Sequence, residues 1–229
     1  MQAYYNNQFM LLDEVKVSPL DRGFLFGDGV YEVIPVYNRR LFKGEEHLIR
    51  LENSLDQTRI ENPLSRAEWL EILNQLIESN SERLGDDQAV YLQVTRGYAP
   101  VRNHAFPDQS ESTVFAYSMP LTPPDYGDAN YPGANVVTCE DERWQRCDIK
   151  SVNLLANAMA NQYARDNNAA EAILLRGGNV VEATSSNVFI VKNKVILTPP
   201  KDNILGGITR QCVLDLAKKS GFKISRNCD

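Results

Sequence analysis

A segment rich in proline, glycine and aspartate interrupts this chain near its middle and most constrains its fold. It reads PLTPPDYGDANYPG and spans positions 120–133. Such a composition favours turns and loops over a continuous helix or strand. Helix-like and strand-like patterns precede and follow it, so we predict two lobes of mixed α/β structure. The predicted N-terminal domain covers 1–120, the linker 121–133 and the C-terminal domain 134–229, with a cleft between the lobes of the kind that small molecules prefer.

Periodicity and turn residues predict the elements of each lobe. In the first lobe we expect a hairpin over the first dozen residues, a strand through 31–35, helices at 45–60 and 65–80, and strands at 89–97 and 112–119. In the second lobe we expect strands at 134–140, 169–175, 180–191 and 195–198, with helices at 153–166 and 208–220. Ser65 and Glu68 have the spacing of a helix capping box, and Gly221 is a candidate helix C-cap.

Composition disfavours several classes of function. The chain has 229 residues, a formal net charge of −6 and no cluster of lysine or arginine, so we expect no nucleic-acid partner. Its first residues lack a basic segment followed by an apolar run, and nothing approaches the length of a membrane span, so we expect a cytoplasmic protein. The four cysteines lack metal-binding spacing and only two histidines are present, so we expect neither a metal site nor a disulfide framework.

Lys150 lies at a predicted strand-to-helix junction, in the sequence CDIKSVNLL. Most lysines are solvated surface groups, and Lys150 taken alone could be one of them. Its position between a charged strand end and an apolar helix is typical of a partly desolvated amine. Such an amine can lose its proton and form a Schiff base with an aldehyde cofactor.

Two further motifs could supply the other groups that hold pyridoxal phosphate. Glu182, in VVEATSSNVFIV, lies early in a predicted strand, and its carboxylate against a pyridine nitrogen would favour the protonated ring. In ILGGITR, two glycines precede a predicted helix whose first amides, those of Ile208 and Thr209, could bind a phosphate. A solvent-exposed strand end and an ordinary glycine turn are the alternatives for these two motifs.

Basic side chains in the first lobe could bind anions. Arg50 falls within a predicted helix, near the edge of its apolar stripe, and could reach a phosphate with two hydrogen bonds. Arg102 and His104 are two residues apart on the predicted loop YAPVRNHAFP, an arrangement that suits a carboxylate. A solvated helix face and an exposed polar loop are the alternatives.

Taken in order, these motifs resemble those of the class IV aminotransferases, which are pyridoxal phosphate enzymes of fold type IV. The matching text includes FGDGVYEVIPVYN, HLIRLENSL, DIKSVNLL, EAILLR, VVEATSSNVFIV and ILGGITR, so the resemblance covers nearly the whole chain. Within the family, VTRG followed by RNHAFP, together with the flanks of Lys150, is most similar to D-amino acid (D-alanine) aminotransferases. The resemblance implies a two-lobed enzyme with a small N-terminal and a larger C-terminal α/β domain.

The resemblance also implies a role for each candidate residue. Lys150 would form the Schiff base and move the proton between the substrate Cα and the cofactor. Glu182 would contact the pyridine nitrogen, Arg50, Ile208 and Thr209 would bind the phosphate, Leu205 would pack on the ring, and the substrate pocket would include Tyr31, Arg102 and His104. Arg102 and His104 would reach the α-carboxylate from a neighbouring subunit of a homodimer. The substrates would be an amino acid and a 2-oxo acid.

Two features of this sequence differ from the family pattern. Pro35 stands where some relatives carry lysine, and one extra residue separates TRG from the Arg102–His104 pair, so both bear on substrate preference. Relatives also continue for several dozen residues beyond Asp229, through a stretch that contributes a serine/threonine turn to the phosphate site. The resemblance therefore leads us to expect an incomplete C-terminal domain.

Amino-group transfer between a D-amino acid and a 2-oxo acid is the function that these residues favour. A 4-amino-4-deoxychorismate lyase, with the same fold and cofactor, is the nearest alternative, because it shares nearly every candidate residue. The sequence EATSSNVF departs from the wording usual in branched-chain L-amino acid aminotransferases. A non-enzymatic or inactive protein that keeps the fold is an alternative of another class.

Overall fold

The computed structural model describes residues 1–121 and 132–226, which fall into two compact units. The first unit is Met1–Asp125 with Ile149–Asn153, and the second is Tyr126–Asp148 with Leu154–Asp229. Packing therefore places Lys150 in the first unit, although the sequence placed it after the linker. Most of the predicted linker, as well as Cys228, lies outside the described residues, and the predicted domain boundaries stay a prediction.

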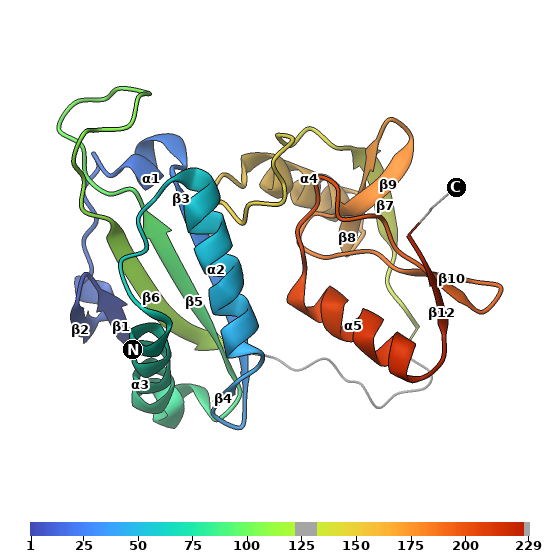
Figure 1. Ribbon diagram of the computed structural model, residues 1–229, viewed down its shortest axis with the longest axis horizontal. Coiled ribbons are helices and arrows are strands. Elements are labelled where there is room, and N and C mark those ends of the chain that lie inside the picture. Colours follow the sequence, from blue (N-terminus) through green and yellow to red (C-terminus); the bar gives the residue numbers. More distant parts are fainter. Residues whose placement is uncertain (122–131, 227–229) are drawn as a thin grey trace. The chain divides into compact units, whose positions relative to one another are not determined.

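An antiparallel sheet of six strands forms the first unit (Figure 1). Its order is β2 (Gln8–Leu11), β1 (Gln2–Tyr5), β6 (Thr113–Pro120), β5 (Gln88–Thr95), β3 (Gly29–Tyr37) and β4 (Arg40–Leu41). The predicted hairpin and strands of this lobe are confirmed. Asn6 and Asn7 form the hairpin turn with φ of 42° and 67°, values that asparagine tolerates better than most residues.

Two helices, α2 (Gly44–Thr58) and α3 (Arg66–Leu84), cover one face of this sheet (Figure 1). Both were predicted, although α3 ends at Leu84 rather than near position 80. The predicted capping box of Ser65 and Glu68 is formed at the start of α3. Buried residues recur along α2 at helical spacing and join one apolar core with the inner face of β3 and with α3; this core includes Leu48, Leu51, Leu55, Val30, Ile34, Val36, Trp69 and Leu73.

A short helix, α1 (Arg22–Phe26), precedes β3 and was not predicted, because the glycines around it suggested an irregular segment. The Asp21 side chain caps it by accepting a hydrogen bond from the Gly23 N–H, and Gly27 ends it with a φ of 66°. A side chain at position 23 could not be accommodated, since a Cβ there would lie 2.3 Å from Thr95 Cγ2. The glycines therefore permit a tight helical turn against β5.

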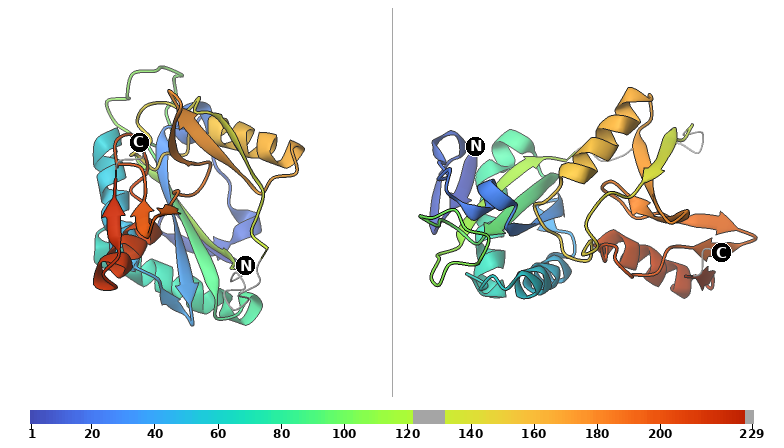
Figure 2. Two further views of the ribbon diagram at one scale, coloured as in Figure 1. Left: turned by 90° about the vertical axis from the view of Figure 1, so that its right-hand side faces the viewer. Right: turned by 90° about the horizontal axis from the view of Figure 1, so that it is seen from above.

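In the described part of the second unit, two three-stranded sheets are accompanied by two helices (Figure 2). One sheet has the order β7 (Val136–Glu140), β8 (Glu171–Arg176), β9 (Asn179–Ala183), with β7 and β8 parallel. The other has the order β10 (Ile190–Lys192), β11 (Val195–Leu197), β12 (Lys223–Ser225), with β11 and β12 parallel. Helix α4 (Leu155–Asp166) packs on β7 and β8, and α5 (Ile208–Lys219) packs beside β12. Throughout the described ranges, no helix has the length and apolar character that a membrane span requires.

Two predicted elements of the second unit are corrected. The strand predicted at 180–191 is two strands, because β9 ends at Ala183 and β10 begins at Ile190. The hydroxyls of Thr184 and Ser185 both donate to the Glu171 carboxylate, and these bonds accompany the break. Helix α5 ends at Lys219, with Ser220 rather than Gly221 as its cap, and Gly221 follows with a φ of 75°.

Strand β3 carries a carboxylate into the apolar core of the first unit. Alternate residues of β3 are buried, and Glu32 lies on this buried face with a fully buried side chain. Two residues of α2 bind it: the Nε and Nη2 atoms of Arg50 each donate at 2.7 Å, and His47 Nδ1 lies 2.8 Å from Glu32 Oε2. Burial raises the pKa of Glu32, but the hydrogen bonds from Arg50 and His47 outweigh it and hold that pKa below its usual value. The charge is therefore paired where water cannot solvate it.

Neighbouring residues of α2 allow a matched test of the core. Leu48 is fully buried, whereas Ile49 is 41% exposed. We expect Leu48→Ala to lower the free energy of unfolding by about 3 kcal/mol and Ile49→Ala by less than about 1 kcal/mol, because only the first leaves a cavity. Unfolding in urea measures both values, and equal losses would contradict the assigned core face of α2.

The buried carboxylate predicts a dependence of stability on pH. Glu32→Gln should lower the free energy of unfolding at neutral pH by about 3 kcal/mol, since Arg50 loses its charge partner in the core. A carboxylate whose pKa is lowered by folding stabilises the protein above its unfolded-state pKa of about 4.3, and this contribution disappears as pH falls through the lower folded-state value. The difference in free energy of unfolding between wild type and Glu32→Gln should therefore be largest near neutral pH and decrease in acid.

Urea unfolding at a series of pH values measures that difference, with the exposed Glu71→Gln as the matched control. A Glu32→Gln effect of the same size at neutral and strongly acid pH would show that the charge of Glu32 is not what stabilises the core.

Candidate active site

Backbone hydrogen bonds hold Lys150 beside the beginning of β3. The Tyr31 N–H donates to the Lys150 carbonyl at 3.0 Å, and the Val152 N–H donates to the Gly29 carbonyl at 3.0 Å. The Lys150 N–H in turn donates to Ser54 Oγ of α2 at 3.3 Å. The Lys150 Nζ lies 4.2 Å from the centre of the Tyr31 ring. The lysine is thus fixed by its main chain, and its amine lies against an aromatic face.

Helix α2 links Arg50 to this lysine. Arg50 and Ser54 are four residues apart and so lie on the same side of the helix. Both oxygens of Glu32 bind the Arg50 guanidinium, which sets its plane, while Ser54 supports the Lys150 backbone. Among the predicted residues of the first unit, the structure therefore brings Arg50, Tyr31 and Lys150 into one neighbourhood. Sequence reasoning missed Glu32 and His47; the signal was an acidic residue on the apolar side of an alternating strand.

Tyr31 belongs to a row of aromatic side chains on the sheet. Its ring stacks on Tyr91 of β5, with centroids 5.6 Å apart and an interplanar angle of 25°. Burial raises the pKa of the Tyr31 hydroxyl, the neighbouring Glu32 raises it further, and Arg50 opposes the shift. The hydroxyl therefore stays protonated and can donate a hydrogen bond.

Arg102 and His104 meet at Phe26 of α1. The Arg102 guanidinium carbon lies 4.9 Å from the centre of the Phe26 ring, and the His104 ring lies 5.5 Å from it. Both side chains are exposed. Two groups able to donate to a carboxylate are thus gathered on one short loop.

In the second unit, Glu182 is buried near the end of β9 and surrounded by donors. Arg143 Nη1 donates to Glu182 Oε1 at 2.6 Å. The Asn187 amide and the Leu205 backbone N–H both donate to Oε2, each at 3.2 Å. Glu182 is the second-last residue of a short strand, β9. The sequence had suggested that it lies early in a longer strand.

Arg143 is a site residue that the sequence did not reveal. Its Nε and Nη2 donate to Asp141 at 2.8 and 3.0 Å, and Asp141 also accepts from Arg176 at 2.6 Å. Burial raises the pKa of Glu182, and Arg143, whose charge is shared with Asp141, offsets only part of that shift. The charge pattern EDERWQR shows acids and bases but not which of them pair. The result is a carboxyl that its donors hold in one orientation.

The glycine motif connects Glu182 to the start of α5. Leu205 donates its N–H to Glu182, and Gly207 caps the helix in an extended conformation without a side-chain hydrogen bond at the cap. A Cβ at position 207 would lie 2.0 Å from Asn187 Oδ1, so a larger residue would displace the amide that donates to Glu182. Ile208 and Thr209 then form the first turn, where backbone amides and the helix dipole favour an anion. A carboxyl for a ring nitrogen and amides for a phosphate suit pyridoxal phosphate.

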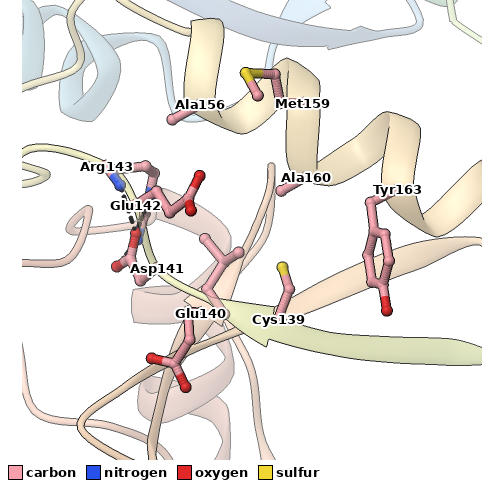
Figure 3. A pocket seen from close by; sticks show the side chains of 10 residues that line it. Cys139, Glu140, Asp141, Glu142, Arg143, Ala156, Met159, Ala160 and Tyr163 are labelled. Atoms are coloured by element: carbon pink, nitrogen blue, oxygen red, sulfur yellow. Dashed lines mark hydrogen bonds and ion pairs between the residues drawn. The ribbon is translucent and has the colours of Figure 1, made fainter.

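A hollow of about 260 Å³ lies between α4 and the end of β7 (Figure 3). Its α4 side is apolar and includes Met159 and Tyr163, whereas its other end carries Glu140, Asp141 and Glu142. The one cation in its lining, Arg143, is already bound by Asp141 and Glu182. A phosphate would meet net negative charge there, so this hollow is a poor candidate for the cofactor phosphate.

The sequence of this chain is similar to those of known enzymes. The sequence model of the class IV amino-transferase family matches residues 29–228. The D-alanine aminotransferase of Bacillus licheniformis is 45% identical over 223 residues, which are 97% of this chain and 77% of that protein. The D-alanine aminotransferase of Staphylococcus aureus (strain N315) is 43% identical over 219 residues, which are 95% of this chain and 76% of that protein.

Solved structures share the fold. A branched-chain aminotransferase from Thermoproteus uzoniensis with norvaline superposes with a TM-score of 0.84 at 24% identity, over 99% of this chain and 77% of that one. A branched-chain amino acid aminotransferase from T.th., solved with pyridoxamine 5'-phosphate, gives a TM-score of 0.84 at 26% identity, over 98% and 75%. The predicted fold class is confirmed. This chain belongs to the class IV aminotransferases, a pyridoxal phosphate-dependent family, and is a transaminase.

Proposed function

We propose that this transaminase moves an amino group between a D-amino acid, such as D-alanine, and a 2-oxo acid, using bound pyridoxal 5'-phosphate. The observation that carries the proposal is the pairing of Arg102 with His104 on Phe26, in a chain whose relatives at 43–45% identity are D-alanine aminotransferases. Arginine and histidine at this spacing can bind the carboxylate that every amino acid and 2-oxo acid carries. Tyr31 would line the substrate pocket, because its ring lies 4.2 Å from Lys150 Nζ.

In this proposal each residue of the first unit has a physical task. Lys150 would hold the cofactor through Nζ, and the same nitrogen would accept the proton from the substrate Cα. Arg50 would bind phosphate oxygens, and Glu32 already sets the plane of its guanidinium. The bound cofactor supplies the electron sink that stabilises negative charge at the Cα.

The second unit supplies the groups for the ring and the rest of the phosphate. Glu182, held in place by its ion pair with Arg143, would contact the pyridine nitrogen, and its negative charge would favour the protonated ring. Leu205 would cover the ring, and the amides of Ile208 and Thr209 would bind the phosphate together with the Thr209 hydroxyl. We further infer a homodimer in which Arg102 and His104 serve the neighbouring subunit, and an enzyme of the cytoplasm; both remain inferences from the resemblance.

The attachment residue is tested by chemical labelling. Borohydride treatment of the protein with added pyridoxal phosphate should fix the cofactor to the peptide that contains Lys150, as seen by mass spectrometry. Lys150→Ala should lose this label and lower the rate of the D-alanine half-reaction by at least about 10²-fold, because the proton acceptor is gone. The exposed Lys16→Ala should behave as wild type. A label on another lysine, or a Lys150→Ala rate within tenfold of wild type, would refute the assignment.

Substrate handedness is tested with paired assays. With 2-oxoglutarate as acceptor, D-alanine should yield pyruvate and D-glutamate, whereas L-alanine and L-leucine should react at least about 10²-fold more slowly because their side chains are wrongly placed. Chiral chromatography identifies the glutamate. Formation of pyruvate from 4-amino-4-deoxychorismate but not from D-alanine would make the enzyme a lyase, and faster reaction of L-leucine would overturn the D-amino acid assignment.

A further inference from the structure

Arg22 of α1 binds the main chain of the loop that carries Arg102 and His104. Its Nη1 donates to the carbonyl of Asn103 at 2.6 Å and to that of Ala105 at 3.3 Å, and its Nη2 donates to the carbonyl of His104 at 3.2 Å. The Arg22 side chain is only 4% exposed. One buried guanidinium therefore holds three consecutive carbonyls of an otherwise exposed loop.

Asp28 fixes Arg22 and connects it to a second arginine. Asp28 Oδ2 accepts from Arg22 Nε at 2.7 Å and from Arg96 Nε at 2.8 Å, and its Oδ1 accepts from Arg96 Nη2 at 2.9 Å. Arg96 also donates to the carbonyls of Thr58 and Arg59 at the end of α2. The position of Arg22 is thus set by a charge cluster that is itself tied to the helix of Arg50.

Aromatic rings complete the support. Phe26 lies 4.7 Å from the Arg22 guanidinium carbon and also contacts Arg102 and His104. Phe106, at the end of the loop, covers the Arg96 guanidinium at 3.6 Å from the ring centre. Cations over aromatic faces gain more when they are withdrawn from water, as Arg22 and Arg96 are. The loop is therefore held both by its carbonyls and by its side chains.

We propose that Arg22 is a positioning residue for recognition of the substrate carboxylate. By fixing the carbonyls of Asn103, His104 and Ala105, it presents Arg102 and His104 in one orientation. This inference rests on the proposed function, in which those two side chains bind the carboxylate. Arginine is required because its N–H donors, spread over a planar fork, are engaged by Asp28 and the three carbonyls. Lysine offers three donors at a single point and cannot reach the same set.

The test is the holoenzyme variant Arg22→Lys, which keeps the charge. We expect the KM values for D-alanine and for 2-oxoglutarate to rise about tenfold or more with kcat within about threefold, because carboxylate binding is lost while the lysine chemistry is intact. Amide hydrogen exchange over 98–106 should become at least about tenfold faster, because the loop loses its anchor. Cofactor binding, read from visible absorbance, should not change. Arg59→Lys is the matched control, because Arg59 lies near Phe106 at 5.5 Å and should leave KM unchanged.

A double-mutant cycle with Arg102→Ala separates this inference from the function on which it rests. If Arg22 acts through Arg102, the combined variant should raise KM by less than the product of the two single effects. An unchanged KM in Arg102→Ala would refute the carboxylate site itself. A raised KM in Arg102→Ala with an unchanged KM in Arg22→Lys, or fully multiplicative effects, would overturn the role of Arg22 alone.

A second variant covers the case in which Arg22→Lys does not fold. Asp28→Asn keeps the size of the side chain and removes the charge that orients Arg22. We expect a smaller rise in KM and a smaller acceleration of exchange in the same loop. Faster exchange without any change in KM would contradict the proposal.

Discussion

The first unit is organised around one carboxylate that water cannot reach. Glu32 is fully buried on the inner face of β3, and both of its hydrogen-bonding partners, Arg50 and His47, lie on α2. A buried charge without partners destabilises a protein by several kcal/mol. A shift of α2 along the sheet would remove the partners of Glu32 and is therefore disfavoured. The position of α2 in turn sets the plane of Arg50 and, through Ser54, the backbone of Lys150. The stability of the core and the geometry of the site therefore depend on the same contact.

Buried charges with two partners also hold the carboxyl of Glu182 and the loop that carries Arg102 and His104. Arg143 is shared between Asp141 and Glu182, and Asp28 is shared between Arg22 and Arg96. In each case a buried ion is held by two partners of opposite charge rather than one, which leaves its side chain a single orientation. Charge-assisted hydrogen bonds in buried surroundings are short and directional. They are suited to holding a functional group still rather than to adding net stability.

Local sequence determined much of this fold and could not determine the rest. Helices α2 and α3 follow from leucine spacing and a capping box, and the glycine turn before α5 follows from ILGGITR. The break after β9 escaped prediction because the bonds that accompany it join Thr184 and Ser185 to Glu171, thirteen or more residues away in the chain. Partners such as Glu32 with Arg50, or Arg143 with Glu182, come from different elements. Tertiary packing brings these partners together, and the periodicity of the sequence cannot predict such pairs.

The register of β3 joins the buried charge to both functional regions of the first unit. Gly29 pairs with Thr95 of β5 on one side and accepts a hydrogen bond from Val152, two residues after Lys150, on the other. Neighbouring strands lie about 4.8 Å apart, so the backbone of the lysine segment and the root of the substrate loop are separated by roughly 10 Å. A slip of β3 by one residue would turn Glu32 out of the core and bring Tyr31 into it. That slip would leave Arg50 and His47 without their carboxylate partner. The buried ion pair therefore also stabilises the register that aligns Lys150 with the loop that starts at Arg96.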